Sequence, residues 1–385
     1  MPLFKKTATS HTRVGVKYFL SVVVIIVFAV SLVLIYRGVG SMFTIEYVSS
    51  SALVAKPIVL EPKYPPLDKK AYDRKIFELA LGTTTIPLSF LESWATSTVT
   101  ATTTGTTTQG VKKRLWPVKA PYPVSGAVLP FKRIVAYYGN YYSTAMGALG
   151  QDPPDVMLSK LAVEVKKWQE ADPNTEVVPA LHYIAVTAQG SPGVNGLYRL
   201  RMPDSEIEKT LKLAKQINGL VFLDIQVGLS TIKDELPEFD VYLKNPDVHI
   251  GVDPEFYMKT KQKPGNVVGS MDAEEINYVI DHLAQIVKDN NLPPKILVIH
   301  RFTMDMVTNY KKIKIVPEVQ VVMDMDGWGS KARKLNTYQL AIRSEPVLFT
   351  GFKLFYKNDL KEGGDMMTPK EVLELRPQPV YIQYQ

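Results

Sequence analysis

Cysteine is absent from all 385 positions of this sequence. Its absence excludes a disulfide scaffold, thiolate-bound zinc, iron–sulfur clusters and a thiol nucleophile. A GxSxG elbow, an HExxH helix and a P-loop are absent too, which excludes the hydrolases and nucleotide-binding proteins that depend on those motifs. What remains is chemistry built on carboxylates.

Acidic residues are missing from the first 40 positions, which carry five Lys and Arg. Those five cations account for most of the formal net charge of +7. The remaining 345 residues carry 40 Lys and Arg against 38 Asp and Glu. Non-specific nucleic-acid binding needs many phosphate-neutralising cations, so this balance predicts that nucleic acid is not a partner.

An uncharged apolar run, Tyr18 to Tyr36 (YFLSVVVIIVFAVSLVLIY), lies between these cations. As a helix it spans roughly 28 Å, close to the bilayer core, and it exceeds the roughly 7–15 apolar residues of a cleaved signal peptide. Four cations precede it and one follows, so the positive-inside rule places the N-terminus in the cytoplasm. We expect a cytoplasmic basic tail at 1–17, a single-pass signal anchor at 18–36 in the cell membrane, and an extracytoplasmic remainder.

Residues 37–110 have the composition of a stalk or linker. Val54–Leu67 is rich in proline, Leu67–Leu81 (LDKKAYDRKIFELAL) has the pattern of a short amphipathic helix, and Thr83–Gln109 consists largely of threonine. A Thr-rich tract has few groups to bury, which is typical of a spacer. We place the domain boundary near residue 110 and a folded domain at 111–385.

The folded domain contains eight runs that are rich in apolar and β-branched residues. Such near-continuous runs indicate strands that are buried on both faces, as in a parallel sheet. The runs are Arg133–Gly139, Glu176–Val186, Leu220–Gly228, Val248–Phe256, Lys295–Phe302, Val319–Gly327, Val347–Tyr356 and Pro379–Gln385.

Helical patterns fill several of the gaps between these strands. They follow Asp155, Pro203-Asp204 and Asp272, and the last has Glu275 at the capping-box position. Weaker helical patterns cover Thr303–Tyr310 and Lys331–Ile342. Eight strand–helix units in about 255 residues predict an α/β fold of the (β/α)8 TIM-barrel type. A doubly wound open sheet is the alternative, but no strand is followed by a Gly-rich dinucleotide fingerprint.

Polar residues gather at the predicted C-terminal ends of these strands, where TIM barrels hold their sites. Strand side chains alternate, so residues two apart share a face. Three such pairs stand out: Asp224 with Gln226, Asp253 with Glu255, and Asp324 with Asp326. The complete set of expected mouth residues is Asn140, His182, Asp224, Gln226, Asp253, Glu255, His300, Arg301, Asp324, Asp326, Trp328 and Lys353.

Glycoside hydrolysis needs one carboxylic acid and one carboxylate across a sugar bond. Glu255, crowded by Asp253, suits the acid, and Asp326 or Asp224 suits the base or nucleophile; the other mouth residues then bind substrate. The same atoms allow a divalent-metal site with Asp253, Glu255, Asp326 and His300 as ligands, for phosphodiester or amide hydrolysis. A third hypothesis is that the barrel binds a glycan or wall polymer without catalysis. No cofactor is required by the first or the third.

Several motifs together resemble a family of secreted or membrane-anchored bacterial (β/α)8-barrel proteins with LDxQxG, DPEW and DGFG-like stretches. The motifs are FLDIQVG, GVDPEF, GSMDAEEINYVIDHLAQIV, LPPKILVIHRF and VVMDMDGWG. The resemblance covers about residues 131–385 and implies an envelope location and a barrel fold, without a particular activity. Phe256 stands where Trp is usual, Arg301 where Gln is usual, and His182 where some relatives have Glu.

Overall fold

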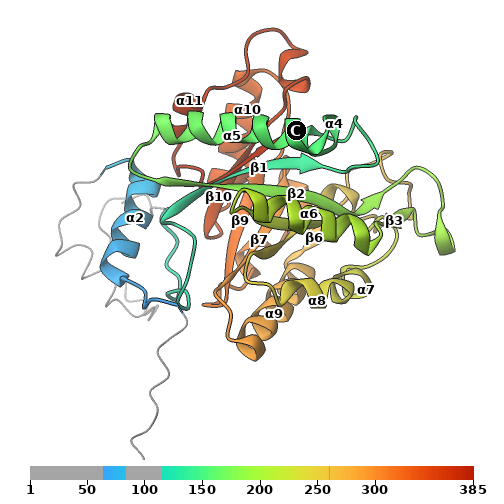
Figure 1. The fold of residues 1–385 in the computed structure, drawn as a ribbon, viewed down its shortest axis with the longest axis horizontal. Coiled ribbons are helices and arrows are strands. Elements are labelled where there is room, and N and C mark those ends of the chain that lie inside the picture. The colour runs from blue at the N-terminus through green and yellow to red at the C-terminus, as the bar shows by residue number, and fades with distance from the viewer. Residues whose placement is uncertain (1–63, 84–114, 260) are drawn as a thin grey trace, which may run out of the picture. The chain divides into compact units, whose positions relative to one another are not determined.

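Eight parallel strands close into a barrel in the computed structural model, which describes residues 64–83, 115–259 and 261–385 (Figure 1). Each strand pairs with the next along the ring, and β1 pairs with both β2 and β11. The strands are β1 (Lys132–Gly139), β2 (Glu176–Ala188), β4 (Leu220–Ile225), β5 (Val248–Val252), β7 (Lys295–Arg301), β9 (Val319–Met325), β10 (Phe349–Leu354) and β11 (Tyr381–Tyr384). The eight predicted strands and the TIM-type barrel are therefore confirmed, and the open-sheet alternative is wrong because the ring closes.

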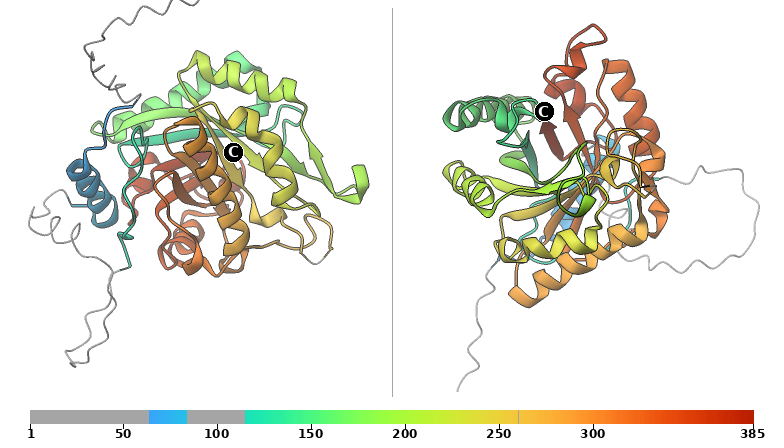
Figure 2. Two further views of the ribbon diagram at one scale, coloured as in Figure 1. Left: turned by 90° about the horizontal axis from the view of Figure 1, so that it is seen from below. Right: turned by 90° about the vertical axis from the view of Figure 1, so that its right-hand side faces the viewer.

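Helices cover the outside of the ring (Figure 2). The longer ones are α5 (Pro154–Ala171), α6 (Asp204–Gln216), α9 (Ala273–Asn290), and α10 (Lys331–Thr337) with its π-helical continuation η6 (Tyr338–Arg343). The capping box predicted at Asp272 and Glu275 is present. At the second helix the N-cap is Pro203, without a side-chain bond, and Asp204 is the first helical residue.

Short elements occupy the loops. The helical turns are α4 (Ala148–Gln151), α7 (Ile232–Glu235), α8 (Asp240–Leu243), α11 (Pro369–Leu373), η1 (Val194–Gly196), η2 (Leu236–Phe239), η3 (Pro254–Phe256), η4 (Met304–Met306), η5 (Tyr310–Lys312) and η7 (Asn358–Leu360). β3 (Arg199–Arg201) pairs antiparallel with β2, and β6 (Met271–Asp272) pairs with β8 (Val307–Thr308).

The helix predicted over Thr303–Tyr310 is wrong. This segment contains η4, then β8, and begins η5. Asn309 has a positive φ of 56°, which interrupts any continuous helix. The two residues of β8 bond to β6 instead, so pairing with a distant segment overrides the local pattern.

Helix α2 (Lys69–Leu81) lies at the end of the barrel where the strands begin (Figure 1). Asp68 caps it, and Gly82 ends it with φ of 71°. The Tyr122 hydroxyl donates to Asp73 at 2.7 Å, and the backbone N–H of Gln378 donates to the Leu79 carbonyl at 2.7 Å. The predicted helix is thus confirmed, and this part of the segment that we assigned to the stalk packs against the barrel.

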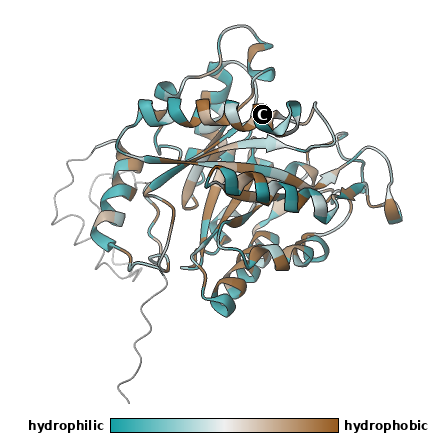
Figure 3. Ribbon diagram, in the orientation of Figure 1, coloured by the Kyte–Doolittle hydropathy of each residue, from teal (hydrophilic) through white to brown (hydrophobic). Residues whose placement is uncertain are grey.

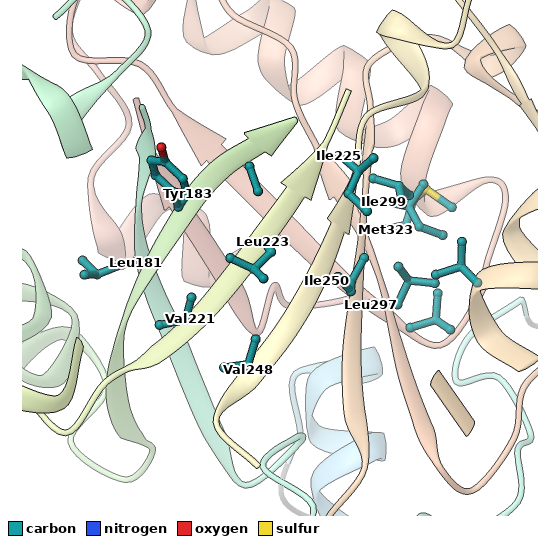
Figure 4. Packing of buried hydrophobic residues seen from close by; sticks show 14 of the residues in the cluster. Leu181, Tyr183, Val221, Leu223, Ile225, Val248, Ile250, Leu297, Ile299 and Met323 are labelled. Carbon is teal, nitrogen blue, oxygen red and sulfur yellow. The ribbon is translucent and has the colours of Figure 1, made fainter. Parts of the chain in front are cut away.

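The main apolar core fills the space between the strands and the surrounding helices. Brown apolar faces of the helices turn toward the sheet in Figure 3. Outward-facing strand residues such as Leu181, Leu223 and Ile299 build this layer, as Figure 4 shows. Burial on both faces explains why the strands read as uninterrupted apolar runs.

Within the part of the chain that the structure describes, no helix is long and apolar enough to cross a membrane. The predicted anchor at 18–36 and the basic tail at 1–17 lie outside the described residues, as does most of the Thr-rich tract.

Candidate functional site

The inside of the barrel changes from apolar to polar along the strands. Its lower part, near the strand starts, contains Ile134, Phe222, Val298 and Val322. Two to four residues further along the strands, the inward-facing side chains are polar and buried. We call them the polar layer: Tyr138, His182, Asp224, Gln226, His300, Asp324, Lys353 and Gln383. Buried polar side chains need hydrogen-bond partners within the protein. These side chains can serve as partners for one another because the alternation along each strand points them all into the barrel.

A pocket of about 530 Å³ opens above this layer, at the C-terminal ends of the strands. Six of the predicted mouth residues line it: Gln226, Asp253, Glu255, Asp326, Trp328 and Lys353. Four others, His182, Asp224, His300 and Asp324, are fully buried and are not among the lining residues. The pocket is the natural place for a ligand because it is concave, lies at the C-terminal ends of the strands and is lined by several titratable groups.

Asp326 is held as a carboxylate. Its Oδ1 lies 2.9 Å from Lys353 Nζ, and its Oδ2 lies 3.3 Å from His300 Nδ1. Burial alone would raise the pKa of Asp326, but the charges of Lys353 and His300 outweigh burial and lower that pKa below its usual value. The Lys353 ammonium is in turn packed over the Tyr138 ring, 3.9 Å from its centroid.

Glu255 is held closer to its neutral form. It follows Pro254 in the turn η3, and its amide donates to Asp253 Oδ1 at 3.2 Å. Burial raises the pKa of the Glu255 carboxyl to about 7, with a further contribution from the negative charge of Asp326. Glu255 therefore retains a proton near neutral pH, whereas Asp326 in the same pocket does not.

Asp253 lies between these groups and the polar layer. Gln226 Nε2 donates to its Oδ2 at 3.2 Å and to the Tyr138 hydroxyl at 3.0 Å. Burial raises the pKa of Asp253 well above its usual value; His300 opposes this shift, while Asp224 and Glu255 add to it. From the sequence we expected Asp253 to raise the pKa of Glu255. Burial and the charge of Asp326 raise it instead, and Glu255 contributes to the raised pKa of Asp253.

Beneath the pocket, Asp224 is surrounded by hydrogen-bonding groups. Its Oδ2 accepts from the Tyr138 hydroxyl at 2.9 Å, and its Oδ1 lies 3.4 Å from His182 Nε2 and 3.5 Å from His300 Nε2. Burial opposes ionisation, yet His182 and His300 lower the pKa of Asp224 well below its usual value.

The two histidines of this layer differ. Burial lowers the pKa of His182 to about 4, so its ring is neutral. Burial would also lower the pKa of His300, but Asp224, Asp324 and Asp326 outweigh it and raise that pKa well above the ordinary value.

Two predicted mouth residues lie elsewhere. Arg301 neighbours His300 on β7 and therefore faces the opposite side of the strand, where it donates to Glu345 Oε2 at 2.5 Å and to the Thr303 carbonyl at 3.0 Å. Asn140 donates to the Ile184 carbonyl at 2.9 Å and is buried. Neither side chain lines the pocket.

Among the aromatics, Trp328 is 41% exposed and lines the pocket with Tyr138 and Phe256. Its ring lies beside Arg333, whose guanidinium carbon is 5.1 Å from the ring centroid. Several further lining residues were not predicted from the sequence: Met146, Phe302, Arg333, Phe355 and Gln385. In a sequence, Met146, Phe302 and Phe355 look like packing residues, and Arg333 and Gln385 look like ordinary surface residues, so nothing marked them.

Two glycines that shape the site were also not predicted from the sequence. A Cβ at Gly251 would lie 2.3 Å from His182 Nε2 and 2.5 Å from Asp224 Oδ1, and one at Gly351 would lie 2.4 Å from Asp324 Oδ1. Both stand at inward positions of apolar strands, so they make the room that the polar layer occupies. A glycine at an inward strand position is the signal that could have located this layer.

The predicted alternative metal ligands, Asp253, Glu255, Asp326 and His300, are not grouped in a metal-binding geometry. Among the described residues, the structure brings together a different set, His182, Asp224 and His300, whose ligand atoms all lie within 4.8 Å of one another.

We predict that Glu255→Gln stabilises the folded protein at alkaline but not at acidic pH. The pKa of Glu255 rises to about 7 on folding, from about 4.3 in an unfolded chain, so the wild type loses stability as pH increases through that interval. Thermal unfolding at about pH 8 and about pH 5 tests this, because glutamine avoids the buried charge only at the higher pH. Glu170→Gln, at an exposed position on α5, should show no difference at either pH; a gap for Glu255→Gln that does not depend on pH would contradict the prediction.

No family model and no curated protein matches the chain. Among solved structures, it is similar to the cellulase Cel5C_n, at 12% identity over 69% of this chain and 79% of that chain, with a TM-score of 0.39. It is also similar to a Bacillus subtilis mannanase (11% identity, 66% and 79%, TM-score 0.35) and to a sugar phosphate isomerase/epimerase from Parabacteroides distasonis (12%, 70% and 90%, TM-score 0.31). Similarities this distant identify neither a family nor an activity.

Proposed function

We propose that this barrel hydrolyses glycosidic bonds in cell-envelope glycans, with Glu255 as the general acid and Asp326 as the essential carboxylate. The observation that carries the proposal is the difference between these two groups in one pocket. Asp326 is paired with Lys353 at 2.9 Å, whereas Glu255 is half-buried and burial raises the pKa of its carboxyl to about 7. Two carboxyl groups whose surroundings push their protonation apart are what glycoside hydrolysis requires.

The roles follow from the contacts. Glu255 donates its proton to the leaving glycosidic oxygen as the bond to the sugar carbon breaks. Asp326 either attacks that carbon directly or removes a proton from an attacking water, and the separation of the two carboxyl groups in the substrate complex decides which. Lys353 and His300 keep Asp326 ionised and oriented. The exposed Trp328 ring offers an apolar surface for a sugar face.

Asp224, which we considered from the sequence as a second base or nucleophile, has a different place in this proposal. It is fully buried and separated from the pocket by Tyr138 and Gln226. Its role is therefore to position Tyr138 and the two histidines.

A glycan panel tests the proposed activity. The purified full-length protein, in mild detergent, is incubated with envelope polysaccharides and with neutral β-glucans and β-mannans, and new reducing ends are measured together with binding. Cleavage of any member supports the proposal. Binding without cleavage would contradict it and favour the non-catalytic wall-binding reading.

We further propose that the chain belongs to the anchored bacterial barrel family that its motifs resemble, and that residues 18–36 hold it in the cell membrane with the barrel outside. The support is the uncharged run at 18–36 and the cations before it. Protease added to intact cells should remove the barrel and leave a short membrane-bound fragment. A barrel that is protected in intact cells, or recovered without the membrane fraction, would overturn the proposed location.

A further inference from the structure

We propose that His182, Asp224 and His300 bind one divalent transition-metal ion inside the barrel, beneath the floor of the pocket. The three residues come from β2, β4 and β7, and all are fully buried. The site lies beneath the pocket and shares His300 with the proposed glycan chemistry, because this residue also contacts Asp326. The inference rests on the geometry of the three ligands and does not depend on that chemistry.

Two of the distances between the ligand atoms are close to those in a metal site, and all three atoms lie within 4.8 Å of one another. His182 Nε2 and His300 Nε2 lie 3.4 Å and 3.5 Å from the same oxygen, Asp224 Oδ1. None of these three buried atoms has a hydrogen-bond partner. In a tetrahedral site with bonds of about 2.0–2.1 Å, neighbouring ligand atoms are about 3.3 Å apart.

The remaining polar atoms of the three ligands are already oriented by neighbours. Tyr138 donates to Asp224 Oδ2 at 2.9 Å. His182 Nδ1 lies 2.5 Å from the Tyr381 hydroxyl, and His300 Nδ1 lies 3.3 Å from both Asp324 Oδ2 and Asp326 Oδ2. Metal-binding imidazoles commonly donate their second N–H to a carboxylate or another acceptor, which fixes the ring and its tautomer. The Tyr381 hydroxyl can accept from His182 Nδ1, which Gln383 Nε2 also approaches at 3.0 Å, and two carboxylates face His300 Nδ1 without a hydrogen bond to it.

Gly251 supplies an independent observation. A side chain there would collide with two of the three ligand atoms, His182 Nε2 and Asp224 Oδ1. The glycine therefore lets these atoms approach the β5 backbone. Phe222 stacks on the His182 ring, 5.2 Å between centroids, and limits its rotation. The site is thus shaped by residues that are not themselves ligands.

Two imidazoles and one carboxylate favour Zn²⁺ or a similar first-row ion over Mg²⁺ or Ca²⁺. Asp324 and Asp326 lie immediately beside His300. Their negative charge would further stabilise a cation in this part of the barrel. An ion here would join three strands across the barrel and would lie beneath the pocket carboxyl groups.

The test is the metal content of the full-length protein, expressed with Zn²⁺ in the medium, dialysed and measured by elemental analysis. We expect about one ion per chain, a lower melting temperature after chelation, and recovery of that temperature when Zn²⁺ alone is added back. His182→Gln and His300→Gln should each lose the ion, whereas His282→Gln, a histidine that pairs with Asp240 between α8 and α9, should retain it.

Two milder variants keep the test informative if the ligand variants fail to fold. Tyr381→Phe removes only the hydroxyl beside His182 Nδ1 and should weaken Zn²⁺ affinity by about 10- to 100-fold, with the fold monitored by circular dichroism. Gly251→Ala should lose the ion with all three ligands still in place. The proposal is overturned if the folded wild type holds less than about 0.1 ion per chain under zinc loading, or if Tyr381→Phe and His300→Gln hold as much as the wild type.

Discussion

Glu255→Gln should lower kcat/KM for glycan cleavage by about 10²- to 10⁴-fold, the range expected when a general acid is removed. Glutamine keeps the size of the side chain and can still donate a hydrogen bond, but it has no proton to give to a leaving oxygen. Burial in the pocket and the charge of Asp326 raise the pKa of Glu255 to about 7, and the substitution deletes that titration.

The pH dependence gives this prediction its second readout. A general acid must be protonated, so wild-type activity should fall as pH increases through about 7. The variant should lose that alkaline limb along with most of its rate. Substrates with activated leaving groups, which need little proton donation, should lose much less rate than natural glycans. A uniform loss on both substrate types, with the alkaline limb unchanged, would show that Glu255 is not the acid.

Asp326→Asn should have a comparable or larger effect, a loss of about 10³-fold or more in kcat, because it removes the charge that stabilises or attacks the sugar cation. Asparagine retains the shape of the side chain and an oxygen for Lys353. The loss should therefore appear in kcat with little change in KM. If Asp326 is the nucleophile, small anions such as azide should restore part of the rate in Asp326→Ala, where the shorter side chain leaves space for them.

Asp289→Asn provides the matched control for this variant. Asp289 is exposed near the C-terminal end of α9, where the side chain of Gln285 donates a hydrogen bond to it. Its activity should equal that of the wild type. Turnover by Asp326→Asn within a few fold of the wild type would exclude Asp326 from the reaction, whatever its place in the pocket.

The barrel was predictable because its strands are buried on both faces. Lys295–Arg301 reads as an apolar run for that reason, and the spacing of eight such runs leaves room for a helix in most gaps. The failure at Thr303–Tyr310 has a non-local cause. Val307 and Thr308 pair with Met271 and Asp272, more than 30 positions earlier, and no local pattern announces such pairing.

The sequence could predict the site residues only where side chains alternate between the two faces of a regular strand. Asp224 with Gln226 and Asp324 with Asp326 face the barrel interior in pairs, as the two-residue period requires. Asp253 and Glu255 do not follow the period, because the strand ends at Val252 and Pro254 begins the turn η3. Glu255 reaches the pocket through this turn rather than along a strand.

Strict use of the same period would have corrected one expectation. His300 and Arg301 are consecutive on β7, so only one of them can face the barrel interior. His300 does so, and Arg301 bonds to Glu345 on the other side. By contrast, the depth of His182 and Asp224 below the pocket could not be predicted from the sequence, because depth depends on how far each strand is staggered around the ring.

One pocket holds both Glu255, which keeps its proton near neutral pH, and Asp326, which does not. Carbon-13 NMR titration of the side-chain carboxyl of Glu255, assigned by the resonance that disappears in Glu255→Gln, measures this directly and needs no substrate. We predict a midpoint at about 7 and a lower midpoint in Asp326→Asn, because the Asp326 charge raises the Glu255 pKa. A midpoint near the usual value of about 4.3, unchanged in Asp326→Asn, would contradict the account.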